Sequence, residues 1–336
     1  MRLAVVLAAV CILTPSRVFA QETKAPDEPR TLGGYTFNYP ATIDSAFIDT
    51  YFGTRTGGRF ETVSDVPLGP ATFTVQGLGV RENIDFQGRL GERWALRVAL
   101  LGQFTTGTSG KALATLGSTY SYGASLGVAF RILRSESTGT QLTARLDAIG
   151  INGGGRLTLG PLARELRNEP LRSIPDVVAN FGDLITEPSS SWGAGASINI
   201  AQALSPMFSI QGSFRLDLRR FQRSPYTVSV GRVDINETGW VPQGGVALGF
   251  DPLVIPLAFL AEYRLSAQND NDPTASANNV LALGTYYSGR RDLELGLTLA
   301  AELGLPPIQG LDANGFPSSS SKGTAFSMAM VMRYFW

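Results

Sequence analysis

The feature that most constrains the fold is the stretch from Ala325 to Trp336, which reads AFSMAMVMRYFW. Large apolar residues occupy every second position, namely Phe326, Met328, Met330, Met332, Tyr334 and Trp336. The positions between them are mostly small, and one of them is charged. Strict alternation with period 2 predicts a β-strand with two different faces. An apolar face that ends in aromatic residues suits a strand in contact with lipid, whereas the alternative is an ordinary edge strand of a soluble sheet.

The same alternation runs through most of the chain from Ala71 onward. Eleven segments are expected to form strands: 71–90, 94–105, 120–132, 141–148, 192–202, 208–219, 240–250, 255–266, 280–288, 292–302 and 325–336. A barrel made by one bacterial chain has an even number of strands, so a twelfth is expected within 31–70, running outward before Ala71. Two short stretches there, 45–52 and 59–63, are candidates between which the pattern does not decide. The sequence thus predicts an all-β fold, a transmembrane antiparallel up-and-down β-barrel of about 12 strands.

The connections between these segments alternate in length. Short ones fall near residues 91, 137, 205, 252 and 290, and longer ones at 106–118, 152–190, 220–237, 267–277 and 303–322. A transmembrane barrel has short periplasmic turns and long external loops, whereas a soluble sandwich or jelly roll, the alternative, needs no such asymmetry. Four tryptophans lie near the ends of expected strands, as in the aromatic girdle of a membrane barrel: Trp94, Trp192, Trp240 and Trp336.

The composition argues against a nucleic-acid-binding protein and against a protein with a transmembrane helix. Lys plus Arg and Asp plus Glu number 28 each, and no basic stripe runs along the chain, so a nucleic acid is not an expected partner. Charged residues make up only 17% of the chain, below the roughly 25% of an average soluble domain. The apolar stretch Val246–Ala261 is interrupted by Asp251, Pro252 and Pro256, so no transmembrane helix is expected. Insertion into a membrane would therefore need a closed barrel.

The first twenty residues have the pattern of a cleavable export signal. An arginine precedes an apolar core at Leu3–Leu13, and a cleavage site follows at Ala20. Residues 21–30 are charged and rich in proline, which predicts a disordered leader. The barrel domain is then expected to span residues 31–336.

The connection at 152–190 is much longer than the others and is expected to contain short helices. Ser173, with a proline two residues later, looks like a helix start. Apolar residues at helical spacing follow it: Val177, Val178, Phe181 and Leu184. A long loop in a compact fold is usually functional. We expect this loop to fold against the external mouth of the barrel, where Arg164, Glu165 and Arg167 would meet the polar rim.

The residue types available give little support to catalysis or metal binding. The chain has no histidine, and its only cysteine, Cys11, lies inside the expected signal, so the usual general base and the usual zinc ligands are missing. Asp270-Asn271-Asp272 could bind Ca²⁺ through oxygen atoms, but the stretch lacks the distant Glu of a full calcium loop, so a plain solvated loop explains it better. We therefore expect no enzyme, no catalytic residue, no cofactor and no metal site.

The charged residues on the polar strand faces form the one informative constellation. An arginine or lysine facing hydrocarbon at mid-depth costs about 2–4 kcal/mol, so these side chains are expected to line the lumen. The set comprises Arg97, Arg131, Arg145, Asp147, Arg215, Asp217, Arg219, Glu262, Arg264, Asp292, Glu294 and Arg333. Two interpretations stay open. The residues could border a narrow pore of mixed charge, or they could pair with one another and fill the interior, because about 12 strands lie between a filled barrel and an open channel.

With its terminal aromatic strand and alternating segments, the chain resembles the bacterial outer-membrane β-barrel proteins, porin-like or transporter-like. The resemblance implies a Gram-negative outer membrane as location and the lipid bilayer as surroundings. It also implies recognition of the last strand by the barrel-assembly machinery. The expected function is a narrow pore or transporter for small solutes. The alternative is a closed structural or adhesive barrel whose external loops bind a partner.

Overall fold

A computed structural model describes residues 30–68, 71–115, 117–157, 185–224, 226–227, 231–267, 277–305, 309–311, 317–319 and 323–336. The expected signal peptide and all but the last residue of the expected leader lie outside these ranges. That last residue, Arg30, is fully buried rather than part of a disordered leader. Within the described ranges, no helix is both long enough and apolar enough to cross a membrane.

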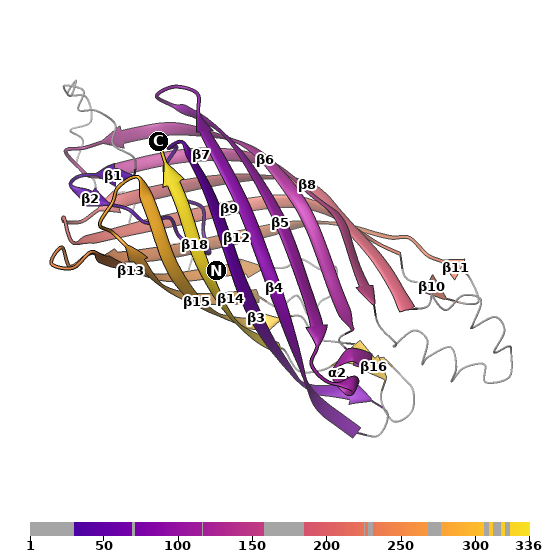
Figure 1. The fold of residues 1–336 in the computed structure, drawn as a ribbon. Helices are drawn as coiled ribbons and strands as arrows, with labels where there is room; N and C mark the ends of the chain where they lie inside the picture. Colours follow the sequence, from indigo (N-terminus) through magenta and orange to yellow (C-terminus); the bar gives the residue numbers. More distant parts are fainter. Residues whose placement is uncertain are drawn as a thin grey trace, which may run out of the picture.

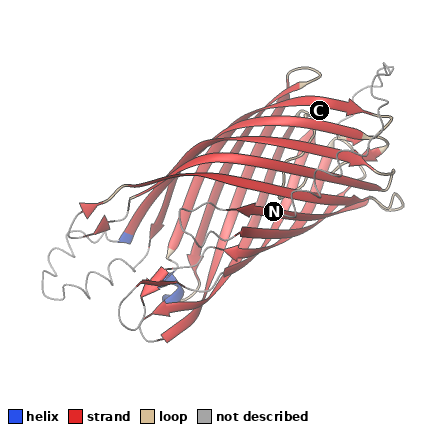
Figure 2. Ribbon diagram, turned by 180° about the vertical axis from the view of Figure 1, so that it is seen from behind, coloured by secondary structure: helices blue, strands red, loops and turns tan. Residues whose placement is uncertain are grey.

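Twelve strands form one closed antiparallel barrel, as the alternating pattern predicts (Figures 1 and 2). They are β3 (Tyr51–Leu68), β4 (Ala71–Arg89), β5 (Trp94–Gly107), β6 (Ser118–Ser135), β7 (Thr140–Leu157), β8 (Thr186–Ala203), β9 (Phe208–Arg223), β12 (Ile235–Phe250), β13 (Leu257–Ala267), β14 (Ala277–Tyr287), β15 (Leu293–Leu305) and β18 (Gly323–Phe335). Each strand pairs with the next one along the chain. The expected twelfth strand is β3, which closes the wall by pairing with β18 from Phe335↔Tyr51 to Thr324↔Thr62.

The ends of the barrel differ as the connection lengths predict. Short turns at 90–93, 136–139, 204–207, 251–256 and 288–292 join strands at one end. The opposite end carries the longer connections and the small elements α2 (Gly110–Thr115), β10 (Tyr226–Thr227), β11 (Gly231–Arg232), β16 (Gln309–Leu311) and β17 (Pro317–Ser319). At that end, only residues 69–70 separate β3 from β4.

The predicted long loop at 152–190 is shorter than expected. Strand β7 continues to Leu157 and β8 begins at Thr186, so strand pairing takes up both ends of the predicted loop. The helices expected in this loop lie outside the described residues, as do Arg164, Glu165 and Arg167, which were expected at the rim. The helix that the structure does describe on this side, α2, belongs instead to the connection between β5 and β6.

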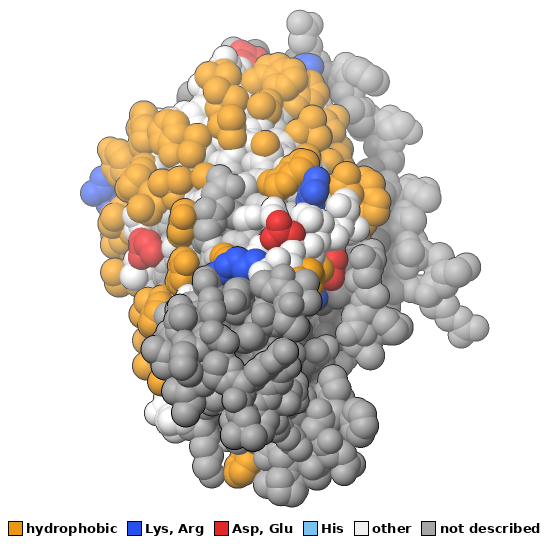
Figure 3. Space-filling view, turned by 90° about the vertical axis from the view of Figure 1, so that its right-hand side faces the viewer, with side chains coloured by type: hydrophobic (Ala, Val, Ile, Leu, Met, Phe, Trp, Pro, Cys, Tyr) orange, Lys and Arg blue, Asp and Glu red, His pale blue; other side chains and the backbone are white. Residues whose placement is uncertain are grey.

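The outer face of the wall is apolar. Exposed side chains follow the alternation from strand to strand, for example Val80, Leu126, Leu146, Leu283 and Met330. Figure 3 views the barrel from the side of the long connections and shows hydrophobic side chains over much of the described surface. An exposed apolar surface of this extent is unfavourable in water, but it suits a wall surrounded by hydrocarbon.

Exposed aromatic side chains mark both borders of this surface. Trp94 and Trp336 lie at the short-turn end, and Trp192 and Trp240 lie toward the other end of their strands. Amphipathic rings at two levels are the arrangement of a membrane-interface girdle. The outward apolar positions therefore extend between two aromatic borders.

Candidate functional site in the barrel interior

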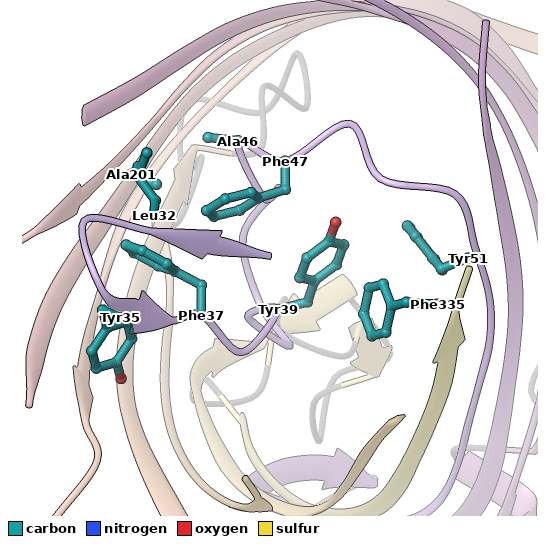
Figure 4. Packing of buried hydrophobic residues seen from close by; sticks show 9 residues of the cluster. All are labelled: Leu32, Tyr35, Phe37, Tyr39, Ala46, Phe47, Tyr51, Ala201 and Phe335. Carbon is teal, nitrogen blue, oxygen red and sulfur yellow. The ribbon is translucent and has the colours of Figure 1, made fainter. Parts of the chain in front are cut away.

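The segment 30–50 lies inside the barrel and forms what we call the plug. It begins with the small hairpin of β1 (Thr31–Leu32) and β2 (Tyr35–Thr36) and continues without regular structure to β3. Figure 4 shows its aromatic side chains surrounded by the strands of the wall. The buried cluster comprises Leu32, Tyr35, Phe37, Tyr39, Ala46 and Phe47 of the plug, with Tyr51, Ala201 and Phe335 of the wall. The sequence analysis did not predict this plug.

Arg30 fixes the start of the plug to the short-turn end. Its guanidinium donates hydrogen bonds to the carbonyl oxygens of Arg290 at 2.8 Å, Arg291 at 3.0 Å and Leu293 at 2.8 Å. The same group lies 3.5 Å from Glu294 Oε2, and neither side chain is exposed. Because these partners belong to the turn at 288–292 and the first residues of β15, the start of the plug lies at the end of the barrel that carries the short turns.

Asp44 fixes the middle of the plug to three arginines of the wall. Its carboxylate lies 3.2 Å from Arg97, 3.0 Å from Arg145 and 3.1 Å from Arg215. Burial alone would raise the pKa of Asp44, but the guanidinium groups of Arg145, Arg97 and Arg215 outweigh it and hold this pKa well below its ordinary value. The carboxylate is therefore ionised, and it anchors the plug by charge.

Polar side chains of the wall satisfy the irregular backbone of the plug. Glu262 accepts hydrogen bonds from the backbone of Ala41 at 2.8 Å and from that of Thr42 at 2.7 Å. Three buried glutamines, Gln87, Gln141 and Gln211, donate to plug carbonyl oxygens. A buried irregular segment needs such partners because its backbone groups cannot bond to water.

A polar cavity of about 380 Å³ remains in the middle of the barrel, with plug residues 40–44 along one side. Seven arginines and two aspartates line it: Arg55, Arg81, Arg97, Arg215, Arg219, Arg264 and Arg333, with Asp44 and Asp85. The lining thus has a formal excess of five positive charges. No group of three potential metal ligands converges anywhere in the described ranges. The possible Ca²⁺ stretch 270–272 lies outside those ranges.

Eleven of the twelve charged residues predicted for the lumen belong to barrel strands and point inward: Arg97, Arg131, Arg145, Asp147, Arg215, Asp217, Arg219, Glu262, Arg264, Glu294 and Arg333. Some of these residues contact the plug, and others line the cavity. Glu262, Glu294 and Arg145 hold the plug, while Arg219 and Arg264 face the cavity. Their role in a passage for solutes remains a prediction.

Asp292 does not belong to the lumen, contrary to the sequence analysis. Strand β15 begins only at Leu293, so Asp292 lies in the preceding turn, where it pairs with Arg290. Its side chain is 38% exposed, and the hydrogen bond from Arg290 lowers the pKa of Asp292 below its ordinary value. The alternation misplaced this residue because it continued the strand one residue too far.

Two cavity arginines were missed by the sequence analysis. Arg81 precedes Asn83 and Asp85 at strand spacing and could have been assigned to the same face. Arg55 lies in β3, where Gly57 and Gly58 weaken the alternating pattern. The alternation could therefore have predicted the inward-facing polar positions of β4, but not those of β3.

Neighbouring positions on β4 test the facing of the wall. Val80 is 60% exposed on the outside, whereas Arg81 lines the cavity. We expect a cysteine that replaces Arg81 to react with a water-soluble thiol reagent, and one that replaces Val80 to react with a lipid-dissolved probe instead. Both variants are measured in the membrane-inserted protein. Equal reaction of the two cysteines with the aqueous reagent would contradict the facing of the strand.

No family model and no curated protein matches the chain. Similar solved structures include the translocator domain of the autotransporter NalP from Neisseria meningitidis, with a TM-score of 0.49 and 12% identity over 86% of this chain and 88% of that one. An outer membrane channel from Pseudomonas putida F1 has a TM-score of 0.49 and 10% identity, over 89% of this chain and 100% of that one. The P. putida toluene transporter TodX has a TM-score of 0.43 and 10% identity, over 86% of this chain and 90% of that one. At such values the likeness supports no inference about function.

Proposed function

We propose that the chain is a barrel of a Gram-negative outer membrane that passes small polar solutes, with the plug acting as a gate. The apolar outer wall supports a location in lipid, and the expected export signal supports transport out of the cytoplasm. Short turns face the periplasm in barrels of this kind, so the plug would close the periplasmic end. Barrel assembly would begin with recognition of β18, whose outer face ends on Tyr334, with Trp336 directly after the strand.

The observation that carries this proposal is the polar cavity next to a plug that is no part of the wall. Each wall strand is held by a ladder of backbone hydrogen bonds on both sides, including the closing pair β18 and β3. The plug is held to the wall mainly by side chains, such as those of Arg30, Glu262 and Gln141. The plug can therefore shift without opening the wall, and its movement would connect the cavity to the short-turn end.

The dense ion pairing around the plug favours a second candidate, a permanently closed structural barrel. Glu294 with Arg30 and Arg333 holds the start of the plug, and Asp44 with its three arginines holds its middle. In this alternative the plug stabilises the barrel and never leaves. The two candidates differ in whether the folded protein conducts ions.

A disulfide between the plug and the wall separates the two candidates. Leu32 and Ala201 belong to the same buried cluster and lie beside each other in Figure 4, and the exported chain is expected to have no other cysteine. We expect the L32C/A201C protein to conduct poorly in planar bilayers when oxidised, because the disulfide holds the plug in place. Reduction should restore the conductance of the unmodified protein.

The matched control is L32C/A201S, which has nearly the same shape but cannot form the disulfide. Its conductance should not respond to oxidant or reductant. If the unmodified protein and the reduced double-cysteine variant both fail to conduct, the closed barrel is the better description. Conductance that persists in the fully oxidised variant would show that solutes pass without movement of this part of the plug.

A further inference from the structure

The carboxylates of the barrel interior are already engaged. Asp44 and Asp147 pair with Arg215, and Asp217 pairs with Arg215 and Arg219. Glu294 pairs with Arg333, and Glu302 pairs with Arg59 at 2.6 Å. Glu262 accepts its hydrogen bonds from plug residues Ala41 and Thr42. These interior acids are thus committed to other arginines or to the plug, and the carboxylate of Asp85 lies 3.9 Å from Arg333.

Three cavity arginines are left without a carboxylate partner in the described part of the chain: Arg55, Arg81 and Arg264. Arg55 donates to the carbonyl oxygen of Ala41, and Arg264 donates to that of Thr42 at 3.4 Å, so both have only neutral acceptors. The Nε group of Arg264 is buried and has no acceptor at all. Burying a charge without an opposite charge is costly, which leaves these groups in need of an anion.

Arg81 extends this pattern across the cavity. It lies on β4 beside Arg55 of β3, and among the charged groups that act most strongly on it, the three arginines Arg55, Arg264 and Arg59 outnumber the carboxylate of Glu302. Like charges that line one cavity repel, and a bound anion would reduce that repulsion even though Arg81 is exposed and Arg55 and Arg264 are half-buried. Nearby, the Nδ2 atom of Asn83 is a further buried donor without an acceptor.

We propose that Arg55, Arg81 and Arg264 form a binding site for the oxyanion group, a carboxylate or a phosphate, of a small solute. This inference rests on the proposed function, because it names the class of solute that the cavity would accept. The planar guanidinium group suits both anions, since its N–H donors match a pair of oxygen atoms. The cavity volume of about 380 Å³ falls within the range of small-molecule sites, about 300–1,000 Å³, and leaves room for a small organic anion.

Binding is tested on the refolded mature protein by isothermal titration with two probes, inorganic phosphate and succinate. Titration does not require conduction, so it tests the site separately from the proposed function. We expect at least one of the two anions to bind, and the stronger of them identifies the preferred group. Succinamide, the uncharged counterpart of succinate, should not bind.

The variants R81Q and R264Q should each weaken binding about tenfold, because each removes a charged hydrogen-bond donor from the anion. Arg81→Lys keeps the charge and should weaken binding less than R81Q. R290Q changes an exposed arginine of the turn at 288–292 and should leave binding unchanged. Heat-modifiable migration on gels confirms that each variant is folded.

The reversal potential in a salt gradient gives an independent readout. The unmodified protein should prefer chloride over potassium, and R81E should reduce or invert that preference. Failure of both anions to bind the folded protein would overturn the inference, as would binding that R81Q and R264Q leave unchanged. Binding in a protein that does not conduct would support the site and reject the proposed passage, whereas conduction without binding would do the reverse.

Discussion

Deletion of residues 30–49 is expected to raise the single-channel conductance of the barrel several-fold. The plug fills the short-turn end, where the aromatic cluster around Tyr39 and Phe47 excludes water from the lumen. A barrel of about twelve strands is wider than the filled eight-stranded type, so an unplugged lumen should admit ions along its full length. The wall should still assemble, because the pairing of β18 with β3 that closes it involves only residues from Tyr51 onward.

The appropriate control replaces residues 30–49 with a Gly/Ser segment of the same length. This variant keeps the chain length but loses the buried aromatic residues, Arg30 and Asp44. If packing of the plug blocks the lumen, both variants should conduct more than the unmodified protein in planar bilayers. Unchanged conductance in a deletion variant that migrates as a folded barrel would place the block elsewhere and argue against the plug as the gate.

The wall could be predicted from the sequence because its rule is local. Alternation assigns each residue to one of two faces, and the apolar face fixes the register of every strand. The short turns near 91, 137, 205, 252 and 290 were located correctly for the same reason. Errors arose at strand ends, as at Asp292 and in the predicted loop 152–190, because alternation does not show where pairing stops.

The plug could not be predicted because its partners are distant in the sequence. Tyr35, Phe37 and Tyr39 alternate like a strand, yet only Tyr35 belongs to one, and that strand is two residues long. The groups that satisfy its backbone, such as Gln141 and Gln211, lie on strands about 100 to 170 residues away. Only the closed barrel brings these groups around the plug, so no local pattern identifies them.

The interior site was predictable in part. The inward charged residues of β5, β6, β7, β9, β13, β15 and β18 were assigned by alternation. Their grouping could not be predicted, because ion pairs join residues from non-adjacent strands and from the plug. Asp44, which joins Arg97, Arg145 and Arg215, lies outside every predicted strand. The distinction between arginines that pair with a carboxylate and those that do not therefore required the structure.

Replacement of Glu294 by alanine is expected to destabilise the folded barrel by roughly 3–5 kcal/mol. Glu294 is fully buried, pairs with Arg333 and Arg30, and accepts a hydrogen bond from the backbone of Tyr39 at 2.9 Å. Its loss would leave two largely buried guanidinium groups with much less negative charge nearby and one plug N–H without its acceptor. The midpoint of urea-induced unfolding, followed by gel migration of the barrel, measures the effect.

The matched control is Asp292→Ala, which removes an exposed carboxylate only two residues away in the sequence and should leave the unfolding midpoint nearly unchanged.

A double-mutant cycle then measures the interaction energy between Glu294 and Arg333 apart from their contacts with other residues. Because E294A already removes the partner of Arg333, the variant E294A/R333A should cost clearly less than the sum of the two single variants. If the two single variants lose stability additively, the two side chains stabilise the barrel independently. If E294A has the same unfolding midpoint as the Asp292 variant, the contacts of Glu294 with Arg333, Arg30 and Tyr39 do not hold the plug.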